Sequence, residues 1–546
     1  MQSALLLDVV APSSLVLGGS KLDVTEPGSS VQPPVAAVTP GITPGWCVAY
    51  RRDDMGDENG PRGRPPGILR TRPAEPDAVE GAFNSNRSTV PPMAQDATNT
   101  HLLNRLVANP ARTVMLGFAV VIAAGTAALM TPLAAEPGES TDLLTALFTA
   151  TSATCVTGLV TVDTATHWST FGELVILAMI QIGGLGVMST ATLLVMVIGR
   201  RLSAPANVLT GAESRSIAHR NPAQVLVDVL KFTLIVETAT AIVLSLRLRS
   251  TYQADWGDAL YSGFFHAVSA FNNAGFGLHA DSAVTWVDDP WMCLPLMASV
   301  MIGGLGFPVW WEMFRHWRQQ FRRWTVHATI TIWGSLVLWI GGTALFAAFE
   351  WRNDDTLGPL STGGKILASG FQSVVARTAG FNSVPIGDLH QETLLLLDGL
   401  MFIGGGSAGT AGGIKITTFA LLGFVIWAEI RGEPTVRILH RRLPPANLRQ
   451  ALTIALLGVG LVVGGTAVLL IVSPFHLDAV LFEAISAFAT VGMSTGITAD
   501  LPPVGQVVLI VLMFLGRLGP ITLGAALALR HRPRRFEVPT ERLLVG

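Results

Sequence analysis

The sequence predicts an all-α polytopic membrane protein built from four repeats of membrane span, pore loop and membrane span around a pseudo-fourfold pore. Of its 546 residues, 50% are hydrophobic and only 14% are charged, with a mean hydropathy of +0.49. Soluble domains carry about 25% charged residues, so this composition indicates a membrane protein. Apolar stretches long enough to cross a bilayer alternate with short polar segments, and four of these segments share one pattern.

The shared pattern is a short helix-compatible stretch that runs into small polar residues and then a glycine. Such segments are too short and too polar to span a bilayer, which requires about 20 apolar residues. Non-helical backbone at membrane depth is tolerated where protein buries it or where it lines a cavity. The four glycines are Gly158, Gly275, Gly380 and Gly492, spaced by roughly 110 residues, a period far longer than that of solenoid repeats. We therefore expect four domain-sized copies with re-entrant loops.

The expected repeats occupy residues 109–199, 224–314, 325–431 and 449–530. The preceding segment, 1–108, is rich in Pro, Gly, Ser and mixed charge, and we expect it to be a disordered tail. Residues 531–546 are expected to form a C-terminal tail. The eight predicted spans are 112–132, 172–198, 224–248, 291–313, 326–349, 393–430, 450–473 and 504–529. The even-numbered spans share a glycine-rich signature, and such small residues let helices approach closely in lipid.

Charge predicts the orientation of these spans. Arginines gather between the repeats and after the last one, for example at Arg200, Arg315, Arg431 and Arg530. By the positive-inside rule these segments and both termini are cytoplasmic. The pore loops then lie on the opposite, acidic side of a multi-pass protein in the cell (inner or plasma) membrane, in contact with lipid. No nucleic-acid partner is expected.

Four loops around one axis suit a monovalent cation, because backbone carbonyls can replace its hydration shell. Glycine allows the close-packed backbone that such a filter needs. The C-terminal ends of four pore helices would add negative potential. The candidate filter residues are Cys155, Val156, Thr157, Gly158, Asn272, Asn273, Ala274, Gly275, Arg377, Thr378, Ala379, Gly380, Thr490, Val491 and Gly492. No catalytic constellation or metal-ligand spacing is present, so we expect no enzyme and no metal other than the permeating ion at the filter backbone.

Two features suggest control of flow. Ten small residues, 404–413, interrupt the sixth span, and each glycine costs a helix about 1 kcal/mol relative to alanine. We expect an intramembrane loop below the filter, the alternative being a loose helix packed on a neighbour. Arg517, inside the eighth span, would act as an electrostatic barrier, contact this loop, or form a salt bridge to Glu483. The candidate gate residues are Gly404, Gly405, Gly406, Gly409, Gly412, Gly413, Lys415 and Arg517. Glu237, in the third span, would join an ion path or form an interior hydrogen bond.

Six stretches resemble the Trk/Ktr/HKT superfamily of potassium transporters, and specifically a TrkH/KtrB-type membrane subunit. They are residues 151–159, 181–186, 269–276, 376–382, 410–415 and 514–520. The resemblance implies potassium coordination around the four glycines, a gating loop at 404–413 and a basic pore residue at Arg517. A serine at the position of Gly158 would accompany sodium preference in this family, so glycine favours potassium. It further implies a homodimer and a separate cytoplasmic ring of nucleotide-binding regulatory subunits.

The expected function is potassium uptake through a gated, carbonyl-lined filter, with potassium as the transported ion and no covalently bound cofactor. Sodium stays open as a coupling or regulatory ion. One alternative is a sodium or poorly selective monovalent cation transporter. An alternative of another class is a secondary transporter of an organic solute, which would show a paired inverted repeat rather than four parallel copies.

Overall fold

The computed structural model describes residues 110–136, 138–206, 222–315, 324–438 and 441–529. The chain divides into two units, Met1–Met93 and Ala94–Gly546, and all described residues lie in the second. The predicted tails, 1–108 and 531–546, lie outside the described residues.

The helices fall into four successive sets, in each of which a long helix is followed by a short one and then by a further long or broken helix. The first set is α2 (Pro110–Leu129), α3 (Leu143–Cys155), the single turn α4 (Thr164–His167) and α5 (Thr170–Ala206). The second set is α7 (Pro222–Thr251), α8 (Trp256–Asn272), α9 (Pro290–Leu305) and α10 (Phe307–Arg315), with the 3₁₀ turn η2 (Val284–Trp286). The third set is α11 (Val326–Glu350), α12 (Thr362–Val375), α13 (Gln391–Phe402) and α14 (Ile416–Ile430), with η4 (Ile386–Asp388). The fourth set is α15 (Pro445–Val472), α16 (Leu477–Ala489) and α17 (Pro503–Leu529).

The only sheet among the described residues is a small antiparallel hairpin between α14 and α15. Its strands are β1 (Arg437–Ile438) and β2 (Arg441–Arg442), with Arg437 opposite Arg442.

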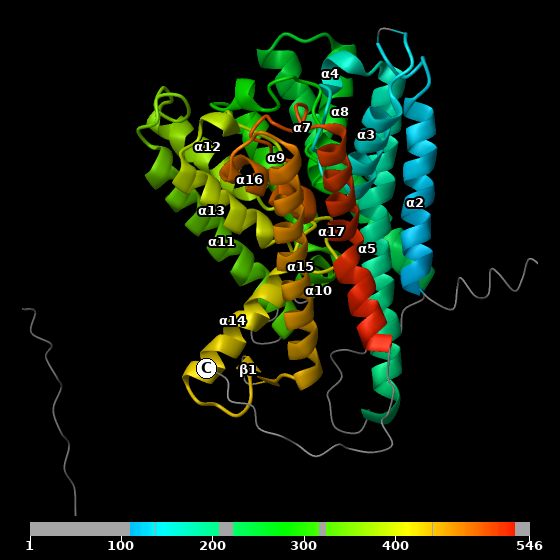
Figure 1. Ribbon diagram of the computed structural model, residues 1–546, viewed down its shortest axis with the longest axis vertical. Coiled ribbons are helices and arrows are strands. Elements are labelled where there is room, and N and C mark those ends of the chain that lie inside the picture. Colours follow the sequence, from blue (N-terminus) through cyan, green and yellow to red (C-terminus); the bar gives the residue numbers. More distant parts are fainter. Residues whose placement is uncertain (1–109, 137, 207–221, 316–323, 439–440, 530–546) are drawn as a thin grey trace, which may run out of the picture. The chain divides into compact units, whose positions relative to one another are not determined.

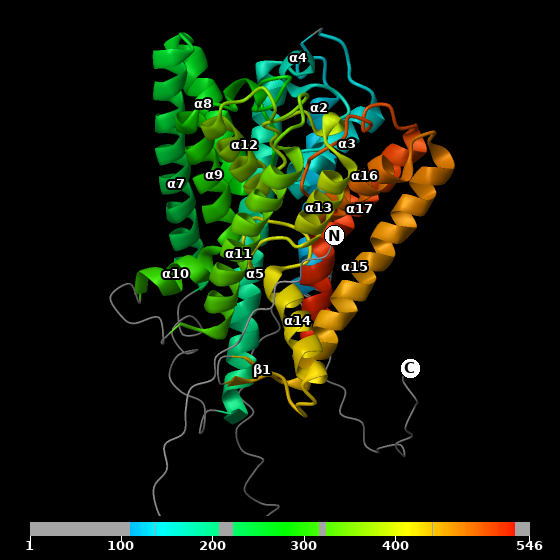
Figure 2. The same cartoon turned by 90° about the vertical axis from the view of Figure 1, so that its left-hand side faces the viewer.

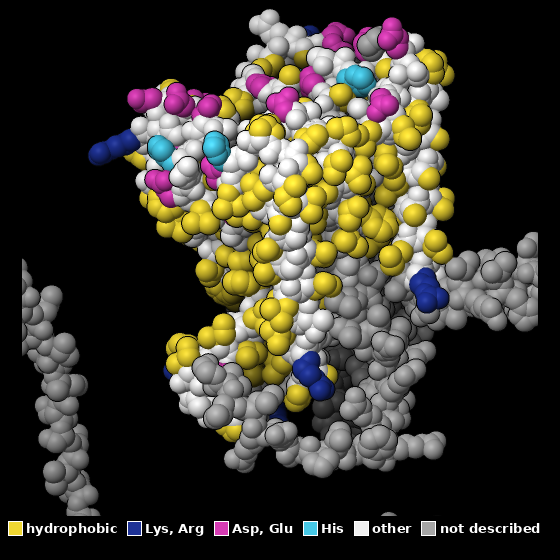
Figure 3. All heavy atoms as spheres, in the orientation of Figure 1, with side chains coloured by type: hydrophobic (Ala, Val, Ile, Leu, Met, Phe, Trp, Pro, Cys, Tyr) yellow, Lys and Arg dark blue, Asp and Glu magenta, His cyan; other side chains and the backbone are white. Residues whose placement is uncertain are grey.

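Long helices run along the vertical axis of Figure 1, and the four short helices α3, α8, α12 and α16 lie in the upper half of both ribbon views (Figures 1 and 2). Figure 3 shows acidic side chains gathered at this upper end, above a broad belt of hydrophobic side chains. On the long helices, Ile235, Val337 and Ile471 are 69%, 66% and 83% exposed, which suits lipid rather than water. The prediction of an all-helical membrane protein is confirmed.

Among the described residues, five helices are long and apolar enough to cross a membrane, and a sixth span counts if α9 and α10 are taken together. The predicted span over 291–313 is bent, because α9 and α10 meet at an angle of 93°. Gly306 between them has φ +90°, a conformation open mainly to glycine. Pro308 then lies in the first turn of α10, where a missing N–H costs nothing.

The sixth span is interrupted between α13 and α14. Residues 403–415 form no helix, and α14 by itself is an apolar helix of only 15 residues. The last long helix, α17, has 27 residues and is apolar over Pro503–Gly519.

The short helices begin at capping residues near the acidic end. Asp142 accepts a hydrogen bond from Leu144 N at 2.9 Å, and Ser361 accepts one from Gly364 N at 3.0 Å. Asp255 does the same for α8. An N-cap acceptor stabilises the first turn by about 1 kcal/mol. Each cap therefore fixes where a short helix starts, and so where its other end arrives.

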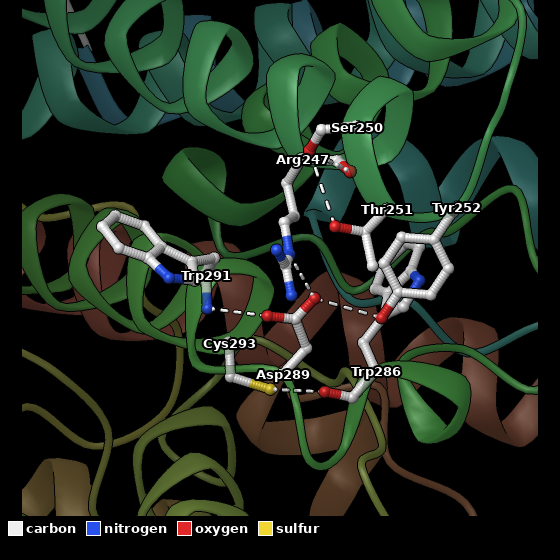
Figure 4. A network of polar contacts seen from close by, with 8 residues as sticks. All are labelled: Arg247, Ser250, Thr251, Tyr252, Trp286, Asp289, Trp291 and Cys293. Carbon is white, nitrogen blue, oxygen red and sulfur yellow. Dashed lines mark hydrogen bonds and ion pairs between the residues drawn. The ribbon is translucent and has the colours of Figure 1, made fainter.

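A polar network joins the end of α7 to the start of α9 (Figure 4). Asp289 caps α9 through its Oδ1, which accepts from Trp291 N at 3.0 Å. Its Oδ2 accepts from Arg247 Nε at 2.7 Å and from Tyr252 OH at 3.1 Å. Nearby, Cys293 Sγ donates to Trp286 O at 3.2 Å. Because both helices flank α8, this network holds the frame around the second short helix.

Candidate functional site

The loops after the four short helices share one backbone feature. A non-glycine residue with positive φ stands two positions before each repeated glycine: Val156 (57°), Asn273 (60°), Thr378 (83°) and Thr490 (50°). A left-handed conformation costs an ordinary residue about 1–2 kcal/mol, so the surrounding packing must enforce it. In the first, second and fourth loops this residue directly follows the helix, whereas α12 ends earlier, at the right-handed Ala376.

Two of these loops are also held by a serine of their own helix. Ser152 Oγ accepts a hydrogen bond from Gly158 N, and Ser486 Oγ accepts one from Gly492 N, both at 3.1 Å. In the second loop the corresponding Ser269 supplies its backbone carbonyl to Ala274 N at 2.8 Å. The serine six residues before the glycine thus anchors the first and fourth loops in the same way.

The four glycines approach one another in a closed cycle. A Cβ placed on any of them would fall within 3.0 Å of a backbone oxygen in the next loop and at about contact distance from that loop's glycine Cα. The successive neighbours are Ala274 and Gly275 for Gly158, Ala379 and Gly380 for Gly275, Val491 and Gly492 for Gly380, and Thr157 and Gly158 for Gly492. All four glycines also have positive φ. Only glycine fits at these positions, and the four loops meet around one point.

Every predicted filter residue outside the glycines is at most 4% exposed. Several of their side chains are directed to other parts of the protein, among them Asn272 and Arg377. Asn272 reaches α5 and α7, and Arg377 Nη2 donates to Gly404 O at 2.9 Å while its guanidinium lies 5.4 Å from the ring centre of Trp339. The sequence pattern placed both residues in the loops but gave no sign of these contacts.

The glycine signature of the even spans meets the ends of the short helices. A Cβ on Gly183, Gly303 or Gly516 would collide with the carbonyl oxygen of Thr154, Phe271 or Phe488, respectively. Each of these carbonyls lies four residues before a repeated glycine. These small residues therefore allow close helix packing, as expected, and here the backbone of a span lies against the C-terminal end of a short helix.

The non-helical segment after α13, here called the intramembrane loop (residues 403–415), lies against the bend of α9. Gly406 N donates to Gly304 O at 2.8 Å, and Thr410 N donates to Gly303 O at 3.1 Å. The loop closes on itself where Gly404 N donates to Ile414 O at 2.9 Å. Thr410 Oγ1 also donates to Asn273 Oδ1 at 2.9 Å. The intramembrane loop thus contacts the second filter loop directly.

Besides Arg377, two cationic side chains donate to the intramembrane loop, the buried Arg517 and the partly buried Lys415. Arg517, 3% exposed on α17, donates through Nη1 to Thr410 O at 2.5 Å, and Lys415 Nζ donates to Ala411 O. Glu483 accepts instead from Ser494, Thr495 and Thr498, so the predicted alternative of an Arg517–Glu483 salt bridge is not found among the described residues. Thr410 and Trp339, which sequence reasoning missed, emerge as contact points between loop and filter residues.

No group of three or more His, Cys, Asp or Glu side chains in the described part of the chain could hold a metal ion. A cation at this site would instead meet backbone carbonyls, whose partial charges suit a weakly held monovalent ion.

Comparison with known proteins shows which family and which relatives this chain is similar to. The family model TrkH, described as a cation transport protein, matches residues 87–532. The chain is 37% identical over 435 residues to the Ktr system potassium uptake protein B of Vibrio alginolyticus, covering 80% of this chain and 94% of that protein. It is 32% identical over 444 residues to the potassium/sodium uptake protein NtpJ of Enterococcus hirae, covering 80% and 97%. The crystal structure of the potassium transporter TrkH from Vibrio parahaemolyticus matches with a TM-score of 0.56 at 18% identity, over 75% of this chain and 82% of that one.

Proposed function

The chain belongs to the TrkH family of cation transport proteins, and we propose that it takes up potassium across the cell membrane as the ion-translocating subunit of a Trk/Ktr-type system. This family consists of transporters rather than enzymes. The proposed path runs from the acidic end through the four glycine loops. The membrane potential drives inward movement, at about 2.3 kcal/mol per charge per 100 mV.

The closed cycle of glycines is the observation that carries this proposal. It brings together Gly158, Gly275, Gly380 and Gly492, which are far apart in sequence, with backbone oxygens of all four loops beside them. Carbonyl oxygens on a tightly packed backbone are the ligands that replace the hydration shell of a potassium ion. In the proposed filter, residues 155–158, 272–275, 377–380 and 490–492 supply these oxygens, and acidic side chains at the outer end raise the local cation concentration.

In the same proposal the intramembrane loop is the gate. It contacts the second filter loop through Thr410, and Arg517 and Lys415 place positive charge on it. The glycines 404–406, 409, 412 and 413 give it a backbone that can rearrange. Movement of this loop would open or close the ion path without altering the filter itself.

The proposal includes the surroundings implied by the family. The protein would be a homodimer in the inner or plasma membrane, with both termini cytoplasmic and with a separate nucleotide-binding ring subunit that acts on the gate. Sodium could enter as a coupling ion. The alternative of a sodium or poorly selective transporter is favoured by one observation only, the potassium/sodium name of the relative from Enterococcus hirae.

The test is rubidium uptake into cells that lack their own potassium uptake systems, comparing wild type with Gly158→Ser. Gly158 has φ +96°, and a Cβ there meets Ala274 O, so serine must displace the backbone of the neighbouring loop. We expect wild type to support growth on low potassium. In the variant we expect rubidium uptake to fall, and sodium to inhibit the remaining uptake more strongly than in wild type. The matched control is Gly341→Ser on α11, where a Cβ meets open space.

Absence of rubidium flux from the wild type, even with a regulatory ring subunit co-expressed, would refute potassium uptake. Equal inhibition of wild-type flux by sodium and potassium would favour the poorly selective alternative.

A further inference from the structure

A carboxyl group lies inside the membrane domain, at the middle of α7, away from the glycine cycle. Glu237 is 2% exposed, and an ionisable residue inside a span is costly unless it has partners and a role. No Lys, Arg or His pairs with it among the described residues. Its partners are neutral amides from two other helices.

The three side chains form a closed triangle. Glu237 Oε1 accepts from Asn272 Nδ2 at 3.1 Å, and Glu237 Oε2 accepts from Gln181 Nε2 at 3.2 Å. The third side is the bond from Asn272 Nδ2 to Gln181 Oε1, at 2.8 Å. The triangle therefore joins α5, α7 and the last residue of α8. Each oxygen of the carboxyl group accepts one hydrogen bond from a side-chain amide.

The backbone of α5 is shaped for this triangle. A Cβ on Gly184 would lie 2.7 Å from Asn272 Cγ and closer still to its Oδ1. The second glycine of the signature in this span therefore leaves room for the Asn272 amide, whereas its neighbour Gly183 faces Thr154 O. Asn272 is held between a glycine on one side and Glu237 on the other.

Asn272 lies where helix α8 gives way to the filter loop. The next residue, Asn273, has the left-handed conformation, and its side chain joins Thr378 Oγ1 of the third loop at 3.4 Å and Thr410 of the intramembrane loop. Gly275 follows two residues later. Any rotation of Asn272 therefore moves the start of the filter loop and its links to two neighbours.

Among the described residues, the other three loops have no equivalent triangle of hydrogen-bonded side chains. The positions equivalent to Asn272, three residues before the glycine, hold Cys155, Arg377 and Ala489. Arg377 bonds to Gly404 O, while cysteine and alanine offer no comparable anchor. No acidic residue occupies the interior of α2, α11 or α15, the counterparts of α7.

We propose that Glu237 is a positioning residue for ion selectivity, which holds Asn272 through the triangle with Gln181 and thereby sets the conformation of the second filter loop. This inference rests on the proposed function. Discrimination between potassium and sodium needs carbonyls held at the right number and spacing, so a loop freed at its first residue would admit the smaller ion more readily.

The experiment measures inhibition of rubidium uptake by sodium and by potassium, in cells lacking their own potassium uptake systems. Glu237→Gln keeps the shape of the side chain but replaces one acceptor oxygen with a donor that faces Asn272 or Gln181. We expect the preference for potassium over sodium to fall by roughly tenfold, equivalent to about 1.4 kcal/mol. The matched control is Glu392→Gln, an exposed acid in the first turn of α13, which should leave the preference unchanged.

A second variant, Gln181→Ala, keeps the carboxylate and Asn272 but removes the bridging amide, and it should shift the preference in the same direction. The ratio of the two inhibitions does not depend on how much protein reaches the membrane. If Glu237→Gln keeps the wild-type ratio of sodium inhibition to potassium inhibition, the inference is overturned. If Glu237→Gln is not inserted into the membrane, a wild-type ratio in Gln181→Ala overturns it instead. Failure of wild-type uptake would instead refute the proposed function.

Discussion

The network around Asp289 allows a stability prediction to be worked from its contacts (Figure 4). Asp289→Ala removes the N-cap of α9, worth about 1 kcal/mol. It removes the hydrogen bond from Tyr252, worth about 0.5–1.5 kcal/mol, because the carboxylate is only 7% exposed. It also removes the ion pair with Arg247, whose side chain is 31% exposed, so that this pair contributes roughly 0.5–1 kcal/mol. The expected loss is about 2–3.5 kcal/mol.

Asp289→Asn separates these contributions. Asparagine caps a helix about as well as aspartate, so the substitution keeps the cap. Its NH₂ group replaces Oδ2 and cannot accept from Arg247 or Tyr252, so we expect a loss of about 1–2.5 kcal/mol. Equilibrium unfolding of the purified protein in mixed micelles measures both variants, and a double-mutant cycle with Arg247→Met isolates the ion pair.

Equal losses in Asp289→Ala and Asp289→Asn would refute this reasoning, because the cap would then contribute nothing. A coupling energy near zero between positions 289 and 247 would remove the ion pair from the account while leaving the cap in place.

Three further predictions follow from other polar groups. Arg517→Gln should raise rubidium uptake severalfold, since it removes a cation bonded to Thr410 O, whereas uptake at or below the wild-type rate would contradict a barrier role. Glu350→Gln should lower the apparent Tm well below that of Glu392→Gln, because the buried carboxylate of Glu350 accepts four hydrogen bonds; equal Tm values would contradict this. Burial lowers the pKa of His279, in the outer loop, below its usual 6.5. The folded state therefore binds a proton at His279 less readily than the unfolded state, and the free energy of unfolding should fall as pH drops below about 6.5. His279→Gln should flatten that slope, and an unchanged slope would contradict the assignment.

The parts of the fold that rest on composition and periodicity could be predicted from the sequence. Apolar length identified the five helices that are long enough to span, and the recurrence of Gly158, Gly275, Gly380 and Gly492 located the four loops after the short helices. The bend at Gly306 was missed because glycines occur throughout these spans, and only the combination of positive φ with Pro308 distinguishes this one. In lipid, a glycine within a span is equally compatible with close helix packing and with a break in the helix.

The partners of buried polar residues could not be predicted, because they are set by how distant helices pack. Glu237 and Asn272 are 35 residues apart, and Arg377 and Gly404 are 27 apart. A lone carboxyl or guanidinium in an apolar stretch predicts a partner but does not identify it. The sequence therefore left Glu237 open between an ion path and an interior hydrogen bond, and the structure supplies the hydrogen bonds.

These contacts divide the four loops into two kinds. The first and fourth loops are fixed from within, by Ser152 and Ser486 of their own helices. The second and third have further bonds to other elements, from Asn272 to α5 and α7 and from Arg377 to the intramembrane loop, although Asn272 Nδ2 also donates to Val268 O of its own helix. The intramembrane loop contacts the fourth filter loop too, because a Cβ on Gly412 would collide with Thr490 Oγ1. A change in the intramembrane loop would therefore reach several filter loops directly, so substitutions at Arg377 or Thr490 should couple flux to selectivity, whereas substitutions at Ser152 in the first loop should alter selectivity alone.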